Sequence, residues 1–497
     1  MKPVIIRTIS HYYLYSPIKE EFLFLEKEFG RFLSQLLKQG IFNLNVKHKV
    51  SENNKNTILE NITENKVNSL FIDKMKLLID NNYLSSLDSS SLLNNRIIEE
   101  DITSNIANTG QITLELTENC NLQCVYCGYG EFYTHKDRAN RKLKYENAVG
   151  IIDYVVKQWN STKSKLSNSK LYIGFYGGEP LLRFDMIKKL VEYSGNKQLN
   201  RGNHIAYIMT TNGLLLDRYI DFFVEHDVKI TVSLDGNEEH NRLRIFKNGK
   251  SSFKKVFENL QIIKKKYPEY FNKKIKINAV LHSENKVSDV TNFIKKSFDK
   301  IPVISALKKT DVKELFQEQF DKILSKNRIH AGWKNQSVTN DIKAVDFITS
   351  YTKNYENYED VFKSTNSENY VPTATCTPFQ LKLFVTADGK IQTCERIGSK
   401  NILGHIVSGN VVIDKKMTVE KYNNLFDRIE PLCQKCYRIK NCKQCIFKID
   451  ERNSLKIKCP QFMNRIEFEM EMTNAIKYME KSTQLNSYII NNSVGKL

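Results

Sequence analysis

The sequence lacks the features of membrane and secreted proteins. No stretch reaches the ~18 consecutive apolar residues that a membrane-spanning helix needs. The apolar run Val4 to Ile6 ends at Arg7, so the N-terminal region does not have the pattern of a signal peptide. With 41% hydrophobic residues and a negative mean hydropathy, the chain is predicted to bury sizeable cores and to be a soluble, cytoplasmic protein.

Acidic residues are fewer than basic ones. The 497 residues include 75 Lys and Arg against 56 Asp and Glu, a formal net charge of +19. This excess suits an acidic partner, either a peptide or a nucleic acid. No dense basic block with interleaved aromatic residues is present, so the sequence favours lysines spread over solvated faces. We do not expect nucleic-acid binding.

Cysteine is absent from residues 1–119 and 128–375. The 10 cysteines fall in two groups, one within 120–127 and one within 376–459. Disulfide or core cysteines would scatter along the chain, and in a reducing compartment grouped cysteines are more often metal ligands. Two to four domains are expected at this length, and each cysteine group is a candidate metal centre.

The first group forms a short loop directly after a strand-like run, Ile112 to Leu116. Cys120, Cys124 and Cys127 have C-x3-C-x2-C spacing. Three thiolates on one loop can hold three corners of a cubane iron–sulfur cluster and leave the fourth iron open. With Tyr126 just before the third cysteine, the loop resembles the cluster loop of the radical S-adenosylmethionine (radical SAM) superfamily.

This resemblance implies a cofactor and a type of reaction. In the family, SAM binds the open iron, and an electron from the reduced cluster cleaves SAM to a 5′-deoxyadenosyl radical. The radical takes hydrogen from an unactivated C–H bond, while the protein orients SAM and excludes solvent. A cellular electron donor such as flavodoxin or ferredoxin is therefore an expected partner.

Five further motifs match the family pattern, each at the end of a strand-like run. Glu179 of Gly177-Gly178-Glu179-Pro180 would meet the SAM amino group. Ser233 and Arg244 would face the ribose and carboxylate, and Asn278 and Val280 would lie beside the adenine. The remaining matching positions are Asn212, which follows the third run, and Asp235, which follows the fourth. Asn241 stands where the family usually has Asp.

Residues 108–310 alternate strand-like and helix-like segments, which predicts βα units and a parallel sheet. Six such units can form a partial (β/α)6, TIM-like barrel that binds ligands at the carboxyl ends of its strands. Helices are expected near 146–159, 186–193, 219–225, 253–265 and 289–298. The strand-like runs are 112–117, 171–176, 205–209, 229–234, 275–281 and 303–307.

Residues 1–107 are predicted to be a small α+β domain. Strand-like runs at 5–10 and 12–16 precede helices near 29–38 and 66–81. The pattern resembles the winged-helix-like domains by which peptide-modifying radical SAM enzymes hold the leader of a precursor peptide through strand addition. A spacer or dimerisation domain remains an open alternative.

The C-terminal part is divided into a helical connection over 311–370, a cysteine-rich domain over 371–465, and a helix and tail over 466–497. The spacing around Gly389 and the seven later cysteines resembles the SPASM domain, which carries auxiliary iron–sulfur clusters, although only two residues separate Cys442 from Cys445. The resemblance assigns one [4Fe–4S] cluster to Cys433, Cys436, Cys442 and Cys459, and another, with an open or non-cysteine position, to Cys376, Cys394 and Cys445. Three clusters would then use all 10 cysteines. Paired zinc knuckles are the alternative.

Glu395 occupies the place of an acidic proton acceptor in sulfatase-maturating relatives, and a surface or salt-bridged glutamate is the alternative. The sequence thus favours an enzyme that oxidatively cross-links a ribosomally made precursor peptide through a thioether or C–C bond. Sulfatase maturation to formylglycine and peptide epimerisation remain open, as does, from a different class, a zinc-containing nucleic-acid-binding protein.

Overall fold

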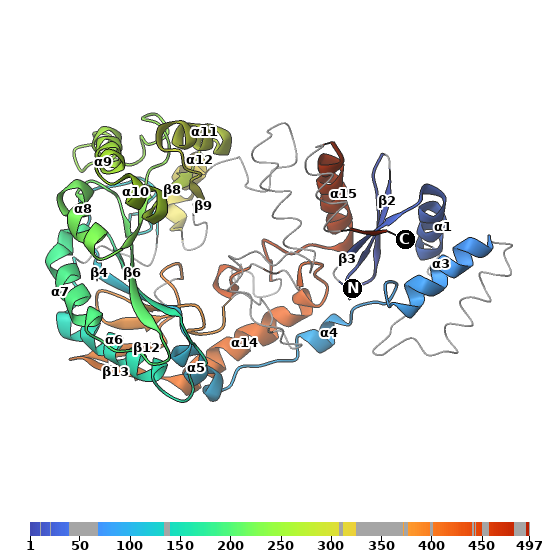
Figure 1. The fold of residues 1–497 in the computed structure, drawn as a ribbon, viewed down its shortest axis with the longest axis horizontal. Helices are drawn as coiled ribbons and strands as arrows, with labels where there is room; N and C mark the ends of the chain where they lie inside the picture. The colour runs from blue at the N-terminus through green and yellow to red at the C-terminus, as the bar shows by residue number, and fades with distance from the viewer. Residues whose placement is uncertain are drawn as a thin grey trace. The chain divides into compact units, whose positions relative to one another are not determined.

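The computed structural model describes most of the chain, and Figure 1 shows its elements. The described residues are 1–9, 11–19, 21–38, 68–133, 140–307, 312–324, 371, 376–397, 401–439, 442, 444–449, 457–481 and 494–496. Two compact units result, each built from separate parts of the sequence. The first comprises Met1–Arg96, Gly332–Thr375 and Asn424–Leu497, and the second comprises Ile97–Ala331 and Cys376–Asn423.

The second unit contains the predicted parallel sheet. Its six consecutive strands lie side by side in chain order and pair in parallel, which confirms the predicted βα pattern. The strands are β4 (Gln111–Thr117), β5 (Lys170–Gly177), β6 (His204–Thr211), β7 (Lys229–Ser233), β8 (Ile275–Leu281) and β9 (Val303–Ala306).

Amphipathic helices cover the outside of this curved sheet (Figure 1). Each turns an apolar stripe inward; in α6 this stripe includes Ile151, Ile152, Val155 and Trp159, all buried. Burial of such a stripe, rather than helix propensity alone, stabilises these helices. They are α6 (Tyr145–Trp159), α7 (Phe184–Gly195), α8 (Leu216–Glu225), α9 (Phe253–Lys266), α10 (Pro268–Lys274) and α11 (Val287–Phe298); α5 (Glu99–Ala107) precedes β4.

Four strands that the sequence did not predict extend the sheet beyond β4. β10 (Leu383–Val385) pairs in parallel with β4, and β11 (Lys390–Gln392), β12 (Gly404–Val407) and β13 (Asn410–Ile413) follow in antiparallel order. The result is a ten-stranded mixed sheet instead of the six parallel strands expected. Gly389, with φ +81°, closes the β10–β11 turn in the left-handed conformation that glycine tolerates best.

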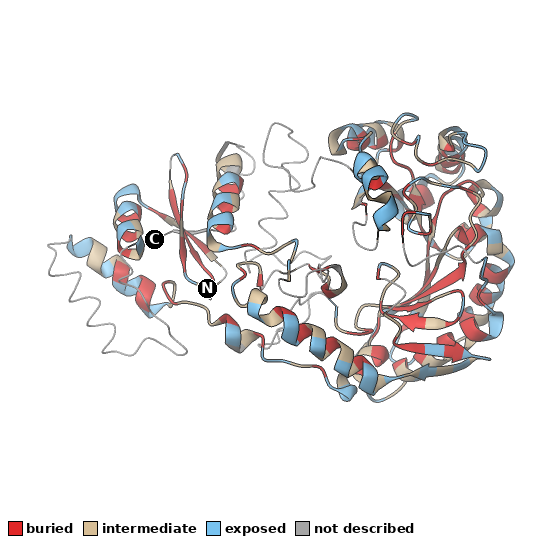
Figure 2. Ribbon diagram, turned by 180° about the vertical axis from the view of Figure 1, so that it is seen from behind, coloured by how far each residue is buried: buried red, intermediate tan, exposed pale blue. Residues whose placement is uncertain are grey.

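The first unit is a small sheet between helices. Its strand order is β1 (Val4–Arg7), β2 (Tyr12–Ser16), β3 (Glu21–Leu25) and β14 (Val494–Lys496). One face packs against α1 (Lys27–Lys38) and α3 (Ser69–Asp80), and the other against α15 (Arg465–Lys481). Figure 1 shows α15 and α1 on opposite sides of the strands, and Figure 2 shows the strands mostly buried. β1, β2, α1 and α3 overlap the two strands and two helices predicted within residues 1–107. The assignment of these residues to one peptide-recognition domain stays a prediction.

The remaining elements are short connections and one long helix. They are α4 (Ser89–Leu92), the 3₁₀ turns Pro180–Arg183, Glu314–Phe316 and Ile446–Lys448, α12 (Gln317–Ile323) and α14 (Lys415–Cys433). The predicted helical connection over 311–370 is helical within 314–323, and residues 325–370 lie outside the described part. Within the described part of the chain, no helix combines the length and apolar character needed to span a bilayer.

Candidate active site

The loop that carries Cys120, Cys124 and Cys127 leaves the carboxyl end of β4, as predicted. Its stem packs directly on the turn after β5: Gly178 N–H donates to Thr117 O (2.8 Å), and Glu179 N–H donates to Asn119 O (2.8 Å). A Cβ on Gly177 would lie 2.2 Å from Thr117 O, and one on Gly178 would lie 2.2 Å from Asn119 O. The two glycines are therefore required for the close approach of the chain's own backbone.

The middle of the cysteine loop is held by the segment after β7. Gln123 N–H donates to Ile245 O (2.8 Å), and Val125 N–H donates to Leu243 O (2.9 Å). These two bonds fix the loop like a short strand beside the segment that carries Arg244. The structure thus brings together the cysteine loop and the Arg244 motif, which are far apart in sequence.

The loop offers the donor set of a cubane cluster, because three thiols follow the carboxyl end of β4. Each thiolate of such a cluster would bind a different iron. Their assignment to a cubane stays a prediction. Burial raises the pKa of Cys124 to about 12, so the loop keeps this thiol neutral until a metal displaces its proton.

Asn212 follows β6 and contacts the same loop. Its Nδ2 lies 2.8 Å from Asn121 Oδ1 and 3.6 Å from Cys120 Sγ, while its Oδ1 accepts a bond from Leu214 N–H (3.0 Å). An amide hydrogen directed at a sulfur stabilises negative charge there. The position predicted for cofactor binding therefore lies beside a predicted iron ligand.

Glu179 is fully buried, and both of its carboxylate oxygens accept internal bonds. Oε1 accepts from Thr211 Oγ1 (2.7 Å) and Leu181 N–H (3.0 Å), and Oε2 accepts from Asn212 N–H (2.8 Å). Burial nevertheless raises the pKa of Glu179 to about 7. An ionised carboxylate has about four acceptor positions, so one remains for a cationic amino group.

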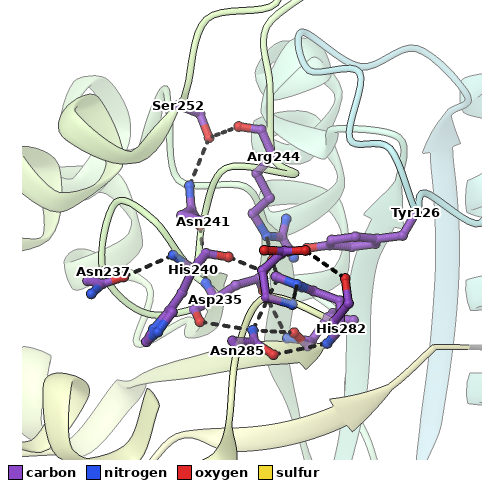
Figure 3. Close-up of polar contacts among 12 residues, drawn as sticks. Tyr126, Asp235, Asn237, His240, Asn241, Arg244, Ser252, His282 and Asn285 are labelled. Atoms are coloured by element: carbon purple, nitrogen blue, oxygen red, sulfur yellow. Dashed lines mark hydrogen bonds and ion pairs between the residues drawn. The ribbon is translucent and has the colours of Figure 1, made fainter. Parts of the chain in front are cut away.

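A buried polar network fixes the aromatic residue of the cysteine loop (Figure 3). Tyr126 donates its hydroxyl to Asp235, and Arg244 Nε donates to the same carboxylate (3.0 Å). The Arg244 guanidinium also lies over the Tyr126 ring, 5.5 Å from its centre. Although burial opposes its charge, Asp235 raises the pKa of Arg244, so Arg244 keeps its charge in the interior.

Asn241, which replaces the Asp expected from the family pattern, has a defined role in this network (Figure 3). Its Oδ1 accepts from Asp235 N–H (3.2 Å), and its Nδ2 donates to Ser252 Oγ (3.3 Å). Ser252 Oγ donates in turn to Arg244 O (2.7 Å). Because an amide both donates and accepts, the substitution maintains the link between Asp235 and the Arg244 segment.

The other predicted SAM contacts lie at the ends of β7 and β8. Ser233 and Asn278 are direct neighbours in the register of these strands, and Val280 N–H donates to Asp235 Oδ1 (2.9 Å). The Asn278 side chain accepts a bond from Ser305 Oγ (2.7 Å). Their assignment to SAM stays a prediction.

Sequence reasoning missed two residues of the site, His282 and Asn285. His282 is fully buried, stacks on Tyr126 (5.9 Å between ring centres), and its Nε2 lies 2.9 Å from His240 O. Burial lowers the pKa of His282, so it is neutral at pH 7. Asn285 Nδ2 donates to Asp235 O (3.3 Å). Their only sequence signal is their place just after the fifth predicted strand.

Glu395 is paired with a lysine. Lys382 Nζ lies 3.0 and 2.8 Å from its two carboxylate oxygens, and Cys394 Sγ lies 3.5 Å from Oε2. Burial acts to raise the pKa of Glu395, but the charge and hydrogen bonds of Lys382 lower it below its ordinary value. The side chain is therefore ionised, able to accept a proton, and a weaker base than an unpaired glutamate.

The later cysteines are divided between the two units. Cys376 and Cys394 belong to the second, with the β4 sheet, whereas the five from Cys433 to Cys459 belong to the first. Burial raises the pKa of Cys394 to about 12 and of Cys442 to about 11. Their assignment to two auxiliary clusters, including Cys436, Cys445 and Cys459, stays a prediction.

Comparison with known proteins agrees with this geometry. Residues 114–296 match the family model of the Radical SAM superfamily. The chain is 29% identical over 179 residues to the radical SAM cyclopropyl synthase TigE of Paramaledivibacter caminithermalis, covering 34% of this chain and 35% of that protein. It is 29% identical over 160 residues to a cysteine-type anaerobic sulfatase-maturating enzyme of Clostridium novyi, covering 31% and 40%. The matched region is less than half the length of each relative.

A solved structure shares the fold. Native anSMEcpe with bound AdoMet and Cp18Cys peptide superposes with a TM-score of 0.50 at 17% identity, over 77% of this chain and 99% of that one. At this identity the likeness concerns the fold alone. It agrees with an α/β architecture that extends well beyond residues 114–296.

Proposed function

Because residues 114–296 form a radical SAM domain, we propose that the chain is a radical SAM/SPASM peptide maturase. In this proposal it oxidatively modifies a ribosomally made precursor peptide, forming a thioether or C–C cross-link. The observation that carries it is the convergence of the Cys120–Cys127 loop, the Glu179 turn and the Asp235–Arg244 network at the carboxyl ends of β4 to β8. Parallel α/β sheets bind their ligands at this end.

Cys120, Cys124 and Cys127 would hold the first cluster. When bound, the cluster and SAM supply the radical that removes hydrogen from the substrate. Glu179 offers a carboxylate to the SAM amino group, and Arg244 offers a fixed cation to its carboxylate, within a buried environment in which such charge-assisted bonds are strong. Tyr126 is held beside Arg244 by its hydrogen bond to Asp235.

Glu395 is proposed as the proton acceptor after hydrogen removal. Its pairing with Lys382 keeps it ionised, which a base requires, and orients the carboxylate beside Cys394. Transfer of a proton from the substrate would neutralise Glu395 and leave the Lys382 charge uncompensated. An arriving negative charge, such as an electron accepted by a nearby cluster, would offset this.

The peptide substrate is supported by the relatives. One matched structure contains a bound peptide, and the first unit offers a small sheet with helices on both faces. A flavodoxin or ferredoxin would supply electrons. Cross-linking is preferred over formylglycine formation because residues 1–96 add a separate sheet before the radical SAM domain.

The first test is SAM cleavage. Anaerobically purified and reduced protein should convert SAM to 5′-deoxyadenosine, and Cys124→Ala should abolish this conversion. Metal analysis should give about twelve irons per chain if three cubanes are present. Stoichiometric zinc without iron would contradict the proposal.

The second test is product formation with the peptide encoded beside this chain's reading frame. Co-expression should lower the peptide mass by about two hydrogens per cross-link. An aldehyde trapped by a hydrazine reagent would indicate formylglycine instead, and an unchanged mass with an altered residue configuration would indicate epimerisation.

The third test addresses Glu395. Glu395→Gln should abolish product and spare formation of 5′-deoxyadenosine, because only the proton acceptor is lost. Glu238→Gln, at an exposed site, is the matched control and should leave both unchanged. Normal turnover in Glu395→Gln would remove this residue from the mechanism.

A further inference from the structure

The small sheet of the first unit has both faces covered by helices. Phe22 of β3 packs in one apolar cluster with Phe468, Met472 and Ile476, which are residues of α15. Leu23 and Leu25 belong to the opposite cluster, which includes Phe29 and Leu33 of α1. A strand that is apolar on both faces needs both covers, so a further partner can reach β3 only along its edge.

The outer edge of β3 is occupied by a strand from a distant part of the sequence. β14 runs parallel to β3, with Val494 opposite Phe22, Gly495 opposite Leu23 and Lys496 opposite Phe24. We call the backbone of Phe22 to Phe24 on this side the β3 edge. The pairing demonstrates that the β3 edge accepts an added strand and that no side chain blocks it.

The added strand is short. It pairs over 3 positions, whereas β2 pairs with the other side of β3 over 5. Parallel pairing is also slightly weaker per residue than antiparallel pairing. A longer peptide that pairs over the whole of β3 would therefore make more backbone hydrogen bonds than β14 makes.

An unpaired β3 edge would be a hazard. Its row of free N–H and C=O groups lies between two apolar layers and would invite pairing with another chain. A weakly held strand protects such an edge without closing it permanently, because it can leave when a better partner arrives.

We propose that residues 494–496 are a displaceable occupant of the β3 edge, which an extended peptide must displace before it can pair with β3. Recognition would use backbone hydrogen bonds, so the partner is a proline-free segment of a peptide. Identification of this segment with the leader of a precursor rests on the proposed function. Residues 494–496 would then compete with the substrate peptide for the β3 edge and lower the apparent affinity of the peptide.

The test uses the full chain and a labelled peptide with the sequence of residues 488–497 as the probe. Only alternate residues of a strand direct their N–H toward a given neighbour, so Val494→Pro/Gly495→Pro removes at least one pairing N–H whichever alternate set of β14 residues faces β3. This variant should leave the β3 edge vacant. If the resident strand occupies the edge about nine-tenths of the time, the variant should bind the probe roughly tenfold more tightly than the wild type.

Two controls accompany this measurement. Val494→Ala/Gly495→Ala keeps both N–H groups and should bind the probe as weakly as the wild type. A probe that itself carries the two prolines should not bind any of the proteins. Equal binding of the unmodified probe by wild type and double-proline variant, no binding by either, or dimerisation of the double-proline variant in light scattering would each overturn the proposal.

A second readout separates this proposal from the proposed function. Formation of 5′-deoxyadenosine by the same variants reports on the radical SAM site and should not change. If the double-proline variant binds the probe but no SAM cleavage is detected in any protein, the proposed function fails and the strand exchange stands. If SAM is cleaved normally but probe binding is identical, only the strand exchange is excluded.

Discussion

Glu179 is the residue whose protonation state should control SAM binding. Its pKa is raised to about 7 by burial, above the ordinary value of 4.5. For a carboxyl with a raised pKa, the stabilisation of the folded state is complete below the ordinary value and is lost as the pH rises through about 7. A bound amino cation would reverse this preference, because it favours the ionised form.

The first prediction follows from the raised pKa of Glu179. SAM affinity should rise about tenfold per pH unit up to pH 7 and level off above it, since Glu179 must lose its proton to accept the amino group. Anaerobic equilibrium binding between pH 5.5 and 8 measures this, with Glu238→Gln as the control. In Glu179→Gln the slope should disappear; a slope that persists there would assign the titration to another group.

The second prediction concerns the buried pair of Asp235 and Arg244. Asp235→Asn leaves Arg244 charged and without its carboxylate, and breaking a buried pair in this way costs about 3–5 kcal/mol. Denaturant unfolding should record this loss together with weaker SAM binding. The exposed pair of Asp221 and Lys266 (2.7 Å) offers the matched control, because Asp221→Asn should change neither. Equal effects of the two substitutions would contradict the role given to burial.

At the residue scale, the sequence predicted which residues belong to the site but not which of them contact one another. The motif positions of Tyr126, Asp235 and Arg244 predicted each as a site residue. Nothing in the sequence indicated that Tyr126 and Arg244 both donate to the buried carboxylate of Asp235. His282 was missed because a single histidine after a strand has no distinguishing pattern. Glu179 and its two preceding glycines were predicted from a motif, yet their packing on the cysteine loop is a tertiary contact that only the fold determines.

At the scale of elements, α6 and the β12–β13 turn meet at two glycines. A Cβ on Gly150 would lie 2.0 Å from Gly409 O, and Gly409 N–H donates to Asn147 Oδ1 (3.1 Å). The close contact attaches the later strands of the sheet to a helix of the radical SAM domain.

The third prediction is that Gly150→Ala forces α6 away from the β12–β13 turn. The substitution should lower the free energy of unfolding by about 1–3 kcal/mol, as overpacking does. Thermal unfolding of anaerobically prepared protein measures it. Gly195→Ala is the control, because its Cβ would lie 3.6 Å from the Tyr207 hydroxyl, an ordinary contact. That substitution should be neutral or stabilise by less than about 1 kcal/mol. A stability unchanged in Gly150→Ala would refute the close packing.

Which elements could be predicted depended on their length and on their place in a repeating pattern. The six strands β4 to β9 alternate with amphipathic helices, and this alternation defined the parallel sheet. β10 to β13 have 3 or 4 residues each, too few to show a period. Gly389 was noted as part of a cysteine pattern, and the structure explains it as the turn residue between two of these short strands.

At the scale of the whole molecule, the fourth prediction concerns the cluster assigned to Cys433, Cys436, Cys442 and Cys459. Cys433→Ala/Cys436→Ala should remove about four irons per chain and leave about eight, because the other two proposed clusters use none of these four cysteines. SAM cleavage with a chemical reductant should persist, while peptide modification should be lost. Iron analysis and 5′-deoxyadenosine formation measure both. Loss of all iron would contradict independent sites.

The pairing of β10 with β4 has a consequence for electron transfer. β4 leads into the loop of Cys120 to Cys127, and β10 and β11 lead to Cys394, so both stretches belong to one hydrogen-bonded sheet. If each stretch holds an iron–sulfur group, the residues that hold the two groups are joined by strand pairing, so their separation would not depend on solvent viscosity or on the length of any linker. Electron exchange between groups held in this way should therefore run at the same rate in crowded and dilute solution.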